Sequence, residues 1–248
     1  MADKITTVPF TPASGRIKPA GEQREVTIVF ADIRSFTTLA ECLSPEELVS
    51  VLNSYLAVVI KSFRQYQGTI HKLMGDSVMA IWNAPNYLVD HAILATRAAA
   101  TAQQMISELR KKESTLPRMD IGIGINTGDA ITGQFGNEYL HEYSVVGDTV
   151  NIAARLTAAT PGGKLWVTSN TFERIEEQVT ARLLNPLILR GKRQPVRAYE
   201  VTGIAASIIG TPADTPVSTL KPGNFSPCGR DGEKWRVLNR SKKKTIHR

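Results

Sequence analysis

Residues 26–32 read VTIVFAD, and residues 72–82 read KLMGDSVMAIW. Each stretch contains an apolar run of the length of a core strand. Asp32 ends the first run, and Asp76 stands just before the second. If the two strands are neighbours, the two carboxylates share one edge of a sheet, and each disfavours the ionised form of the other unless a cation lies between them. Carboxylate oxygens are hard ligands that suit Mg²⁺ or Mn²⁺.

The surrounding sequence predicts that helices alternate with strands. The first strand is expected at residues 24–33. A Ser-Pro-Glu-Glu start and apolar residues at helical spacing predict a helix over 44–66. Strands are expected at 69–73 and 77–82, and the short spacer between them is typical of a β-hairpin. An Ala-rich helix is then expected over 89–112.

The second half begins with a strand that carries glycine on one face. Residues 119–125 read MDIGIGI, which suggests close approach of another backbone or a ligand to the bare face. The sequence NTGD at 126–129 predicts a turn into another strand at 130–135. The remaining expected elements are a helix at 150–160, a strand at 165–168, a helix at 170–175, and strands at 181–187 and 196–201.

The order of these elements predicts an α+β fold. Strand, helix, hairpin, helix and strand form a ferredoxin-like βαββαβ core, in which helices pack on one face of an antiparallel sheet. Extra strands and helices are expected at the C-terminal end of the domain.

Composition divides the chain into three parts. Residues 1–23 are rich in Thr, Pro, Ala and Gly and predict a flexible lead-in, and residues 24–202 hold the domain. Residues 203–248 contain nine Lys or Arg against three Asp or Glu, so they carry most of the net charge of +7 and predict a basic, disordered tail. The nearly neutral domain lacks the basic stripe of a nucleic-acid-binding sheet, so no nucleic acid partner is expected.

Cysteine usage and hydropathy indicate a cytoplasmic protein. Cys42 and Cys228 offer neither metal-ligand spacing nor a disulfide framework. The four histidines show no paired spacing, so a zinc site is not expected. We find no apolar stretch of membrane-spanning length and no secretory signal pattern.

Four segments stand in order along the domain: FADIRSFT at 30–37, KLMGD at 72–76, GINTG at 124–128 and VGDTVNIAAR at 146–155. Together they resemble the catalytic domain of the class III nucleotidyl cyclases, the family of adenylyl and guanylyl cyclases. The resemblance covers about residues 24–202. It implies an enzyme of cyclic nucleotide biosynthesis in intracellular signal transduction.

The resemblance implies a two-metal site. Asp32 and Asp76 would hold two Mg²⁺ or Mn²⁺ ions per site, and the Ile33 carbonyl would also ligate one. One ion would lower the pKa of the ribose 3′-OH, and the other would bind the β- and γ-phosphates and draw charge toward the pyrophosphate leaving group. Phe36 and Thr37 would offer backbone N–H groups to the triphosphate at a helix start.

The remaining catalytic roles follow from the same resemblance. Asn151 would orient the ribose, and Arg155, four residues on and therefore on the same helix face, would stabilise charge on the α-phosphoryl group. Several basic residues in the segment 190–197 are candidates for a triphosphate contact. Lys192 is favoured, with Arg197 as the alternative.

Lys72 and Ser144 would read the base. In this family a lysine at the first position accompanies adenine, and a glutamate accompanies guanine. Lysine only donates hydrogen bonds and adenine N1 accepts them, while a serine oxygen can accept from the exocyclic amine of adenine. The predicted reaction is therefore conversion of ATP to 3′,5′-cyclic AMP and pyrophosphate. A guanylate cyclase and a catalytically silent nucleotide-binding relative are the alternatives.

The family builds its site at a dimer interface. One subunit gives the metal carboxylates, and the other gives the base-reading pair, the Asn and the Arg. Because this chain holds all of them, the resemblance implies a head-to-tail homodimer with two shared sites. Residues 137–143 match the dimerisation arm of the family. Relatives usually carry a regulatory domain before the cyclase, and a regulatory domain or protein outside the chain remains a possible partner.

Overall fold

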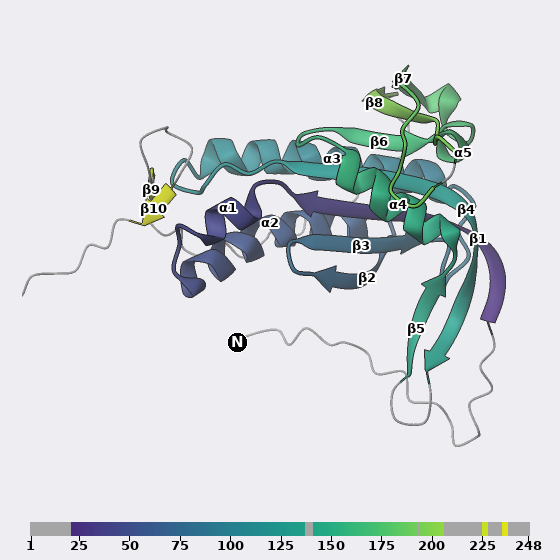
Figure 1. Cartoon of the computed structure of the whole chain (residues 1–248), viewed down its shortest axis with the longest axis horizontal. Coiled ribbons are helices and arrows are strands. Elements are labelled where there is room, and N and C mark those ends of the chain that lie inside the picture. Colours follow the sequence, from purple (N-terminus) through teal and green to yellow (C-terminus); the bar gives the residue numbers. More distant parts are fainter. Residues whose placement is uncertain (1–20, 137–140, 193, 206–224, 228–234, 238–248) are drawn as a thin grey trace, which may run out of the picture.

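An eight-stranded sheet organises the computed structural model, which describes residues 21–136, 141–192, 194–205, 225–227 and 235–237 (Figure 1). The elements are β1 Gly21–Ile33, α1 Phe36–Ala40, α2 Pro45–Gln65, β2 Thr69–Met74, β3 Ser77–Trp82, α3 His91–Lys112, β4 Ile121–Gly136, β5 His141–Val146, α4 Asp148–Ala159, β6 Leu165–Thr168, α5 Ser169–Phe172, the 3₁₀-helix η1 Glu176–Gln178, β7 Val179–Leu183, β8 Ala198–Ile204, β9 Phe225–Pro227 and β10 Trp235–Val237.

The strand order β2-β3-β1-β4 confirms the predicted ferredoxin-like core. β1 lies between β3 and β4 and runs antiparallel to both. The sheet continues through β6, β8 and β7, while β5 pairs with the outer half of β4. Figure 1 shows β5 and the end of β4 reaching away from the body of the sheet.

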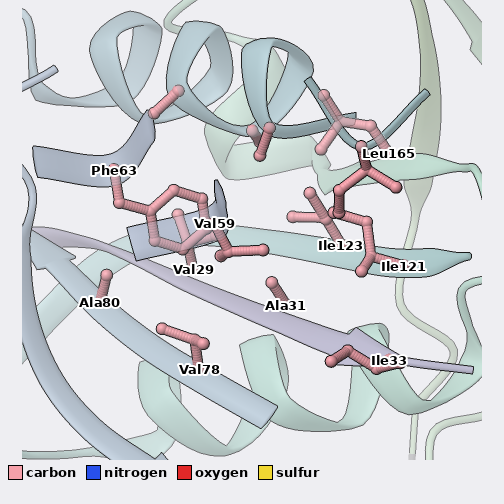
Figure 2. Close-up of a cluster of buried hydrophobic side chains, with 14 of the residues drawn as sticks. Val29, Ala31, Ile33, Val59, Phe63, Val78, Ala80, Ile121, Ile123 and Leu165 are labelled. Carbon is pink, nitrogen blue, oxygen red and sulfur yellow. The ribbon is translucent and has the colours of Figure 1, made fainter. Parts of the chain in front are cut away.

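Helices cover both faces of the sheet. Val29, Ala31 and Ile33 of β1 point into the core formed with α2 and α3, which Figure 2 shows together with Phe63 of α2. The alternate residues of β1, among them Ile28, pack in a second cluster on the α4 side. In Figure 1, α4 passes in front of β1 and β4. The two helices of the predicted core, α2 and α3, therefore share one face as expected, and α4, one of the extra elements, covers the other face.

β4 is a single strand of 16 residues, so the predicted turn at 126–129 was wrong. The turn-forming residues of this segment serve tertiary contacts instead. Asn126 Nδ2 donates to the Thr149 carbonyl of α4 at 2.9 Å, and Asn126 Oδ1 accepts from Thr168 Oγ1 at 2.7 Å. Gly128 lies so close to α4 that an added Cβ would stand 3.0 Å from Thr149 Oγ1. Packing against α4 and β6 therefore accounts for Asn126 and Gly128 in this segment.

The bare glycine face does receive another backbone, as predicted. A Cβ on Gly124 would lie 2.6 Å from the backbone nitrogen of Thr157 in α4, and a Cβ on Gly122 would lie 2.6 Å from the Thr160 carbonyl. Absence of side chains on this face of β4 therefore lets the C-terminal end of α4 sit directly on the sheet.

The other predicted elements are found with shifted ends. α2 begins with the predicted cap, because Ser44 and Glu47 form a reciprocal capping box. The last two strands begin and end differently from the predicted 181–187 and 196–201, since β7 covers Val179–Leu183 and β8 covers Ala198–Ile204.

The two ends of the chain are described only in part. The predicted lead-in falls outside the described residues except for its last three, which belong to β1. Most of the predicted tail also lies outside them, and within it β9 pairs antiparallel with β10. None of the described helices is long and apolar enough to cross a membrane.

Candidate active site

Asp32 and Asp76 lie at one edge of the sheet. Asp32 is near the end of β1, where it pairs with Ser77 of β3, and Asp76 occupies the two-residue turn between β2 and β3. Gly75, at a φ of 61°, makes that turn possible. The Ile33 N–H donates to the Asp76 carbonyl at 3.2 Å and ties the turn to β1. The structure therefore brings together the three residues predicted to bind metal.

The electrostatics of this edge fit a cation. The pKa of the Asp32 carboxyl is raised, chiefly because the group is partly buried. The charge of Arg34 opposes this shift, and the charge of Asp76 adds to it. Two hard carboxylates whose charges oppose each other suit Mg²⁺, which takes one or two carboxylates and completes its shell with water and phosphate. In the described part of the chain, no group of three or more His, Cys, Asp or Glu side chains could hold a metal ion.

Arg34 connects Asp32 to the end of α4. Its Nη1 donates to Asp32 Oδ2 at 2.5 Å, and its Nη2 donates to the carbonyls of Thr157 and Thr160, the latter at 2.7 Å. A Cβ on Gly122 would lie 2.5 Å from Nη2, so the bare face of β4 also makes room for the guanidinium. Arg34 lies within the quoted FADIRSFT segment, but no role was predicted for it.

The turn after β1 leads directly into α1. Ser35 has a φ of 64°, and the five-residue helix begins at Phe36. Phe36 packs against the main core, while Thr37 is exposed. The first N–H groups of a helix have no acceptor within it. The structure thus places both residues in the first turn of a helix beside Asp32, and their contact with a triphosphate stays a prediction.

α4 presents Asn151 and Arg155 on the face that points away from the sheet. Asn151 is exposed and Arg155 half-buried, whereas Ala153, Leu156 and Thr157 are buried. The guanidinium of Arg155 lies against the loop after β7, since a Cβ on Gly191 would stand 3.3 Å from Arg155 Nη2.

Lys192 lies in the same loop and pairs with Asp148 at the start of α4. The loop therefore brings Lys192 to the side of α4 that carries Arg155. Arg197 is exposed just before β8, and its carbonyl accepts from the Ser169 N–H at 3.0 Å. Of the two candidates named from the sequence, Lys192 is therefore placed beside α4 by its ion pair with Asp148.

Lys72 and Ser144 come together from β2 and β5. Lys72 Nζ lies 3.6 Å from Glu142 Oε1 of β5. Ser144 Oγ lies 3.3 Å from Nε2 of His71, the neighbour of Lys72. Two strands far apart in the sequence therefore present both predicted base-reading side chains in one place. His71 and Glu142 are additional members of this group that the sequence analysis did not identify.

This fold and this arrangement of carboxylates, α4 and paired strands define a class III nucleotidyl cyclase catalytic domain. The chain belongs to that family: residues 19–203 match the family described as "Adenylate and Guanylate cyclase catalytic domain". Members of this family generally use divalent metal ions.

Similar proteins include both kinds of cyclase. Adenylate cyclase 1 of Rhizobium meliloti (strain 1021) is 33% identical over 200 residues, which are 79% of this chain but only 30% of that relative. The adenylyl cyclase CyaB from P. aeruginosa superimposes with a TM-score of 0.71 at 30% identity, over 74% of this chain and 96% of that one. The guanylyl cyclase Cya2 superimposes with a TM-score of 0.69 at 32% identity, over 78% and 99%.

Proposed function

We propose that this chain is an adenylate cyclase that converts ATP to 3′,5′-cyclic AMP and pyrophosphate in a head-to-tail homodimer. The observation that supports the choice of base is that Lys72 of β2 and Ser144 of β5 lie on strands whose side chains approach each other, Lys72 beside Glu142 and Ser144 beside His71. Lys72 can donate to adenine N1, and Ser144 can accept from the exocyclic amine. Guanine offers donors at N1 and N2, which a lysine would oppose.

The metal ligands would be the carboxylates of Asp32 and Asp76 and the Ile33 carbonyl. When bound, two Mg²⁺ or Mn²⁺ ions supply activation of the ribose 3′-OH and neutralisation of the pyrophosphate leaving group. The bond that forms joins the 3′-oxygen to the α-phosphorus, and the bond that breaks joins the α-phosphorus to the oxygen that bridges to the β-phosphate.

The protein's own groups bind and orient the nucleotide. Asn151 holds the ribose, and the planar fork of Arg155 stabilises charge on the α-phosphoryl group. Lys192 exchanges its Asp148 partner for the triphosphate. The free N–H groups at Phe36 and Thr37 receive phosphate oxygens in the same region as the metal carboxylates.

The separation of these groups within one chain supports a shared site. Arg34 holds Asp32 at the C-terminal end of α4, next to Thr160, and Thr160 faces the sheet. Asn151 lies nine residues earlier and on the outward face, which places its backbone about 14 Å away along the helix axis. A second copy that presents its outward α4 face to the Asp32 edge would complete one site, and twofold symmetry would complete the other.

A complementation assay tests the reaction and the shared site together. Asp32→Ala and Arg155→Ala proteins should each be inactive with ATP and either Mg²⁺ or Mn²⁺. Their equal mixture should recover about one quarter of the wild-type rate, because random exchange makes half of the dimers mixed and each mixed dimer has one intact site. Mixed dimers without activity would refute the shared site.

The same assay with ATP and GTP decides between the two cyclase activities. We expect wild-type protein to favour ATP. A preference for GTP would assign a guanylate cyclase, and nucleotide binding without cyclic product under Mn²⁺ would assign a silent relative.

A further inference from the structure

His71 is an extra residue in the pairing of β2 with β3. Ile70 pairs with Ala80 of β3 and Lys72 pairs with the preceding residue, Met79, so His71 forms a β-bulge. In a regular strand, consecutive side chains point to opposite faces. A bulge re-aims a side chain. Here both His71 and Lys72 reach side chains of β5.

The contact of His71 with Ser144 bears on a hydroxyl that can act in two ways. Ser144 Oγ has one hydrogen to donate and two lone pairs with which to accept. As an acceptor it fits the exocyclic amine of adenine, and as a donor it fits the carbonyl O6 of guanine. A serine at this position therefore gives no clear choice of base unless another group takes its hydrogen.

We propose that His71 is a specificity-determining positioning residue, which accepts the Ser144 hydroxyl hydrogen at Nε2 and so keeps the serine oxygen free to accept from adenine. The inference rests on the proposed adenylate cyclase activity and deepens it. His71 does not touch the base itself. It sets the direction of the Ser144 hydrogen bond, as a neutral imidazole with its proton on Nδ1.

The surroundings of His71 favour that neutral form. Burial lowers the pKa of His71, while the charge of Glu142 raises it and that of Lys72 lowers it. These two are the charged groups that face it among the described residues, one from β5 and one from β2. A protonated imidazole would instead donate to Ser144 and turn the serine hydrogen toward the base, which would admit guanine.

The test measures the ratio of kcat/KM for ATP to that for GTP, and the same ratio for equilibrium binding of the two nucleotides. His71→Phe removes the acceptor and should lower the ratio about threefold to tenfold, the range that one net hydrogen bond provides. His71→Gln is the matched control, because its side-chain oxygen can accept the same hydrogen and should retain the ratio. In a Ser144→Ala background, His71→Phe should change the ratio no further.

The pH dependence separates this role from a structural one. The wild-type ratio should fall as the pH drops below 6.5, the ordinary pKa of histidine, and the His71→Gln ratio should stay flat. An unchanged ratio in His71→Phe would overturn the inference, and so would a wild-type protein with no preference for ATP. If the wild type makes no cyclic product, the proposed function fails, and the binding ratios still decide the role of His71.

Discussion

Replacing Arg34 with methionine should destabilise the domain and should also weaken the support of Asp32, one of the proposed metal ligands. The guanidinium satisfies two carbonyls at the end of α4, those of Thr157 and Thr160, and one oxygen of Asp32. Methionine keeps much of the apolar stem and removes every donor. The carbonyls then lose their partners beneath a helix that packs directly on the sheet.

The size of the effect follows from these three bonds. Each net hydrogen bond from Arg34 is worth about 1 kcal/mol, so their loss lowers the free energy of unfolding by about 3 kcal/mol. Arg34 and Asp32 are each only about a quarter exposed, with side-chain exposures of 25% and 28%, so solvent replaces little of the loss. For a domain of this size, about 3 kcal/mol corresponds to a fall in Tm of about 6–12 °C.

Thermal denaturation followed by circular dichroism measures this change. Arg34→Lys is the matched control, because it keeps the charge but lacks the fork that reaches Asp32 and α4 together, and we expect an intermediate Tm. Gly122→Ala, whose new Cβ would meet the guanidinium, should destabilise less in the Arg34→Met background than in the wild type. A Tm of Arg34→Met within about 2 °C of the wild type, which is the shift expected for a loss of about 1 kcal/mol or less, would refute the reasoning.

Three further predictions concern α4, a buried histidine and the base. Gly124→Ala places a Cβ 2.6 Å from the Thr157 nitrogen and should lower unfolding free energy by about 1–3 kcal/mol in a denaturant titration. Burial lowers the pKa of His91, so at mildly acidic pH the unfolded state binds a proton that the folded state does not. The free energy of unfolding should therefore fall as the pH drops below 6.5, the ordinary pKa of histidine. A plot of Tm against pH should be flatter for His91→Gln than for the wild type. Lys72→Glu with Ser144→Cys should lower ATP turnover relative to GTP, and an unchanged ratio would contradict our assignment of the base-reading pair.

Local patterns in the sequence were sufficient to predict most of the core. The apolar run before Asp32 and the two-residue spacer around Gly75 act within a few residues, so β1 and the β2–β3 hairpin could be predicted from them. The capping box formed by Ser44 and Glu47 likewise predicts the start of α2 from neighbouring residues alone. These signals depend on short-range chemistry that the fold does not overrule.

At Asn126, tertiary contacts override the local turn pattern. Asparagine and glycine are common in turns, and NTGD at 126–129 has the composition of one. In the fold Asn126 bonds to Thr149 and Thr168, and Gly128 makes room for α4. The bare glycine face pointed toward this answer, because it predicted close approach of another backbone or a ligand, and the backbone of α4 lies there.

The site was harder to predict where a residue acts through distant neighbours. The roles of Arg34 and His71 depend on the end of α4 and on a bulge in β2, and neither follows from local spacing. Phe36, Thr37 and Lys192 were named from the resemblance, and their nucleotide contacts stay predictions.

Arg34 links two groups that, in the proposed dimer, serve different sites. It holds Asp32, which would act in one site, and the end of α4, whose Asn151 and Arg155 would act in the other. Mixed dimers of the Asp32→Ala and Arg155→Ala chains, each with one productive site, separate these effects. Adding Arg34→Met to the Asp32→Ala chain touches the productive site only through α4, whereas adding it to the Arg155→Ala chain touches that site through Asp32.

We expect both additions to lower the recovered rate at a temperature where each mixed dimer remains folded, checked by circular dichroism. If α4 needs its anchor to aim Arg155, the first addition should raise the KM for ATP or lower kcat in the mixed dimer. If only the second addition has an effect, Arg34 acts on the metal carboxylate alone, and the link between the two sites through α4 is wrong.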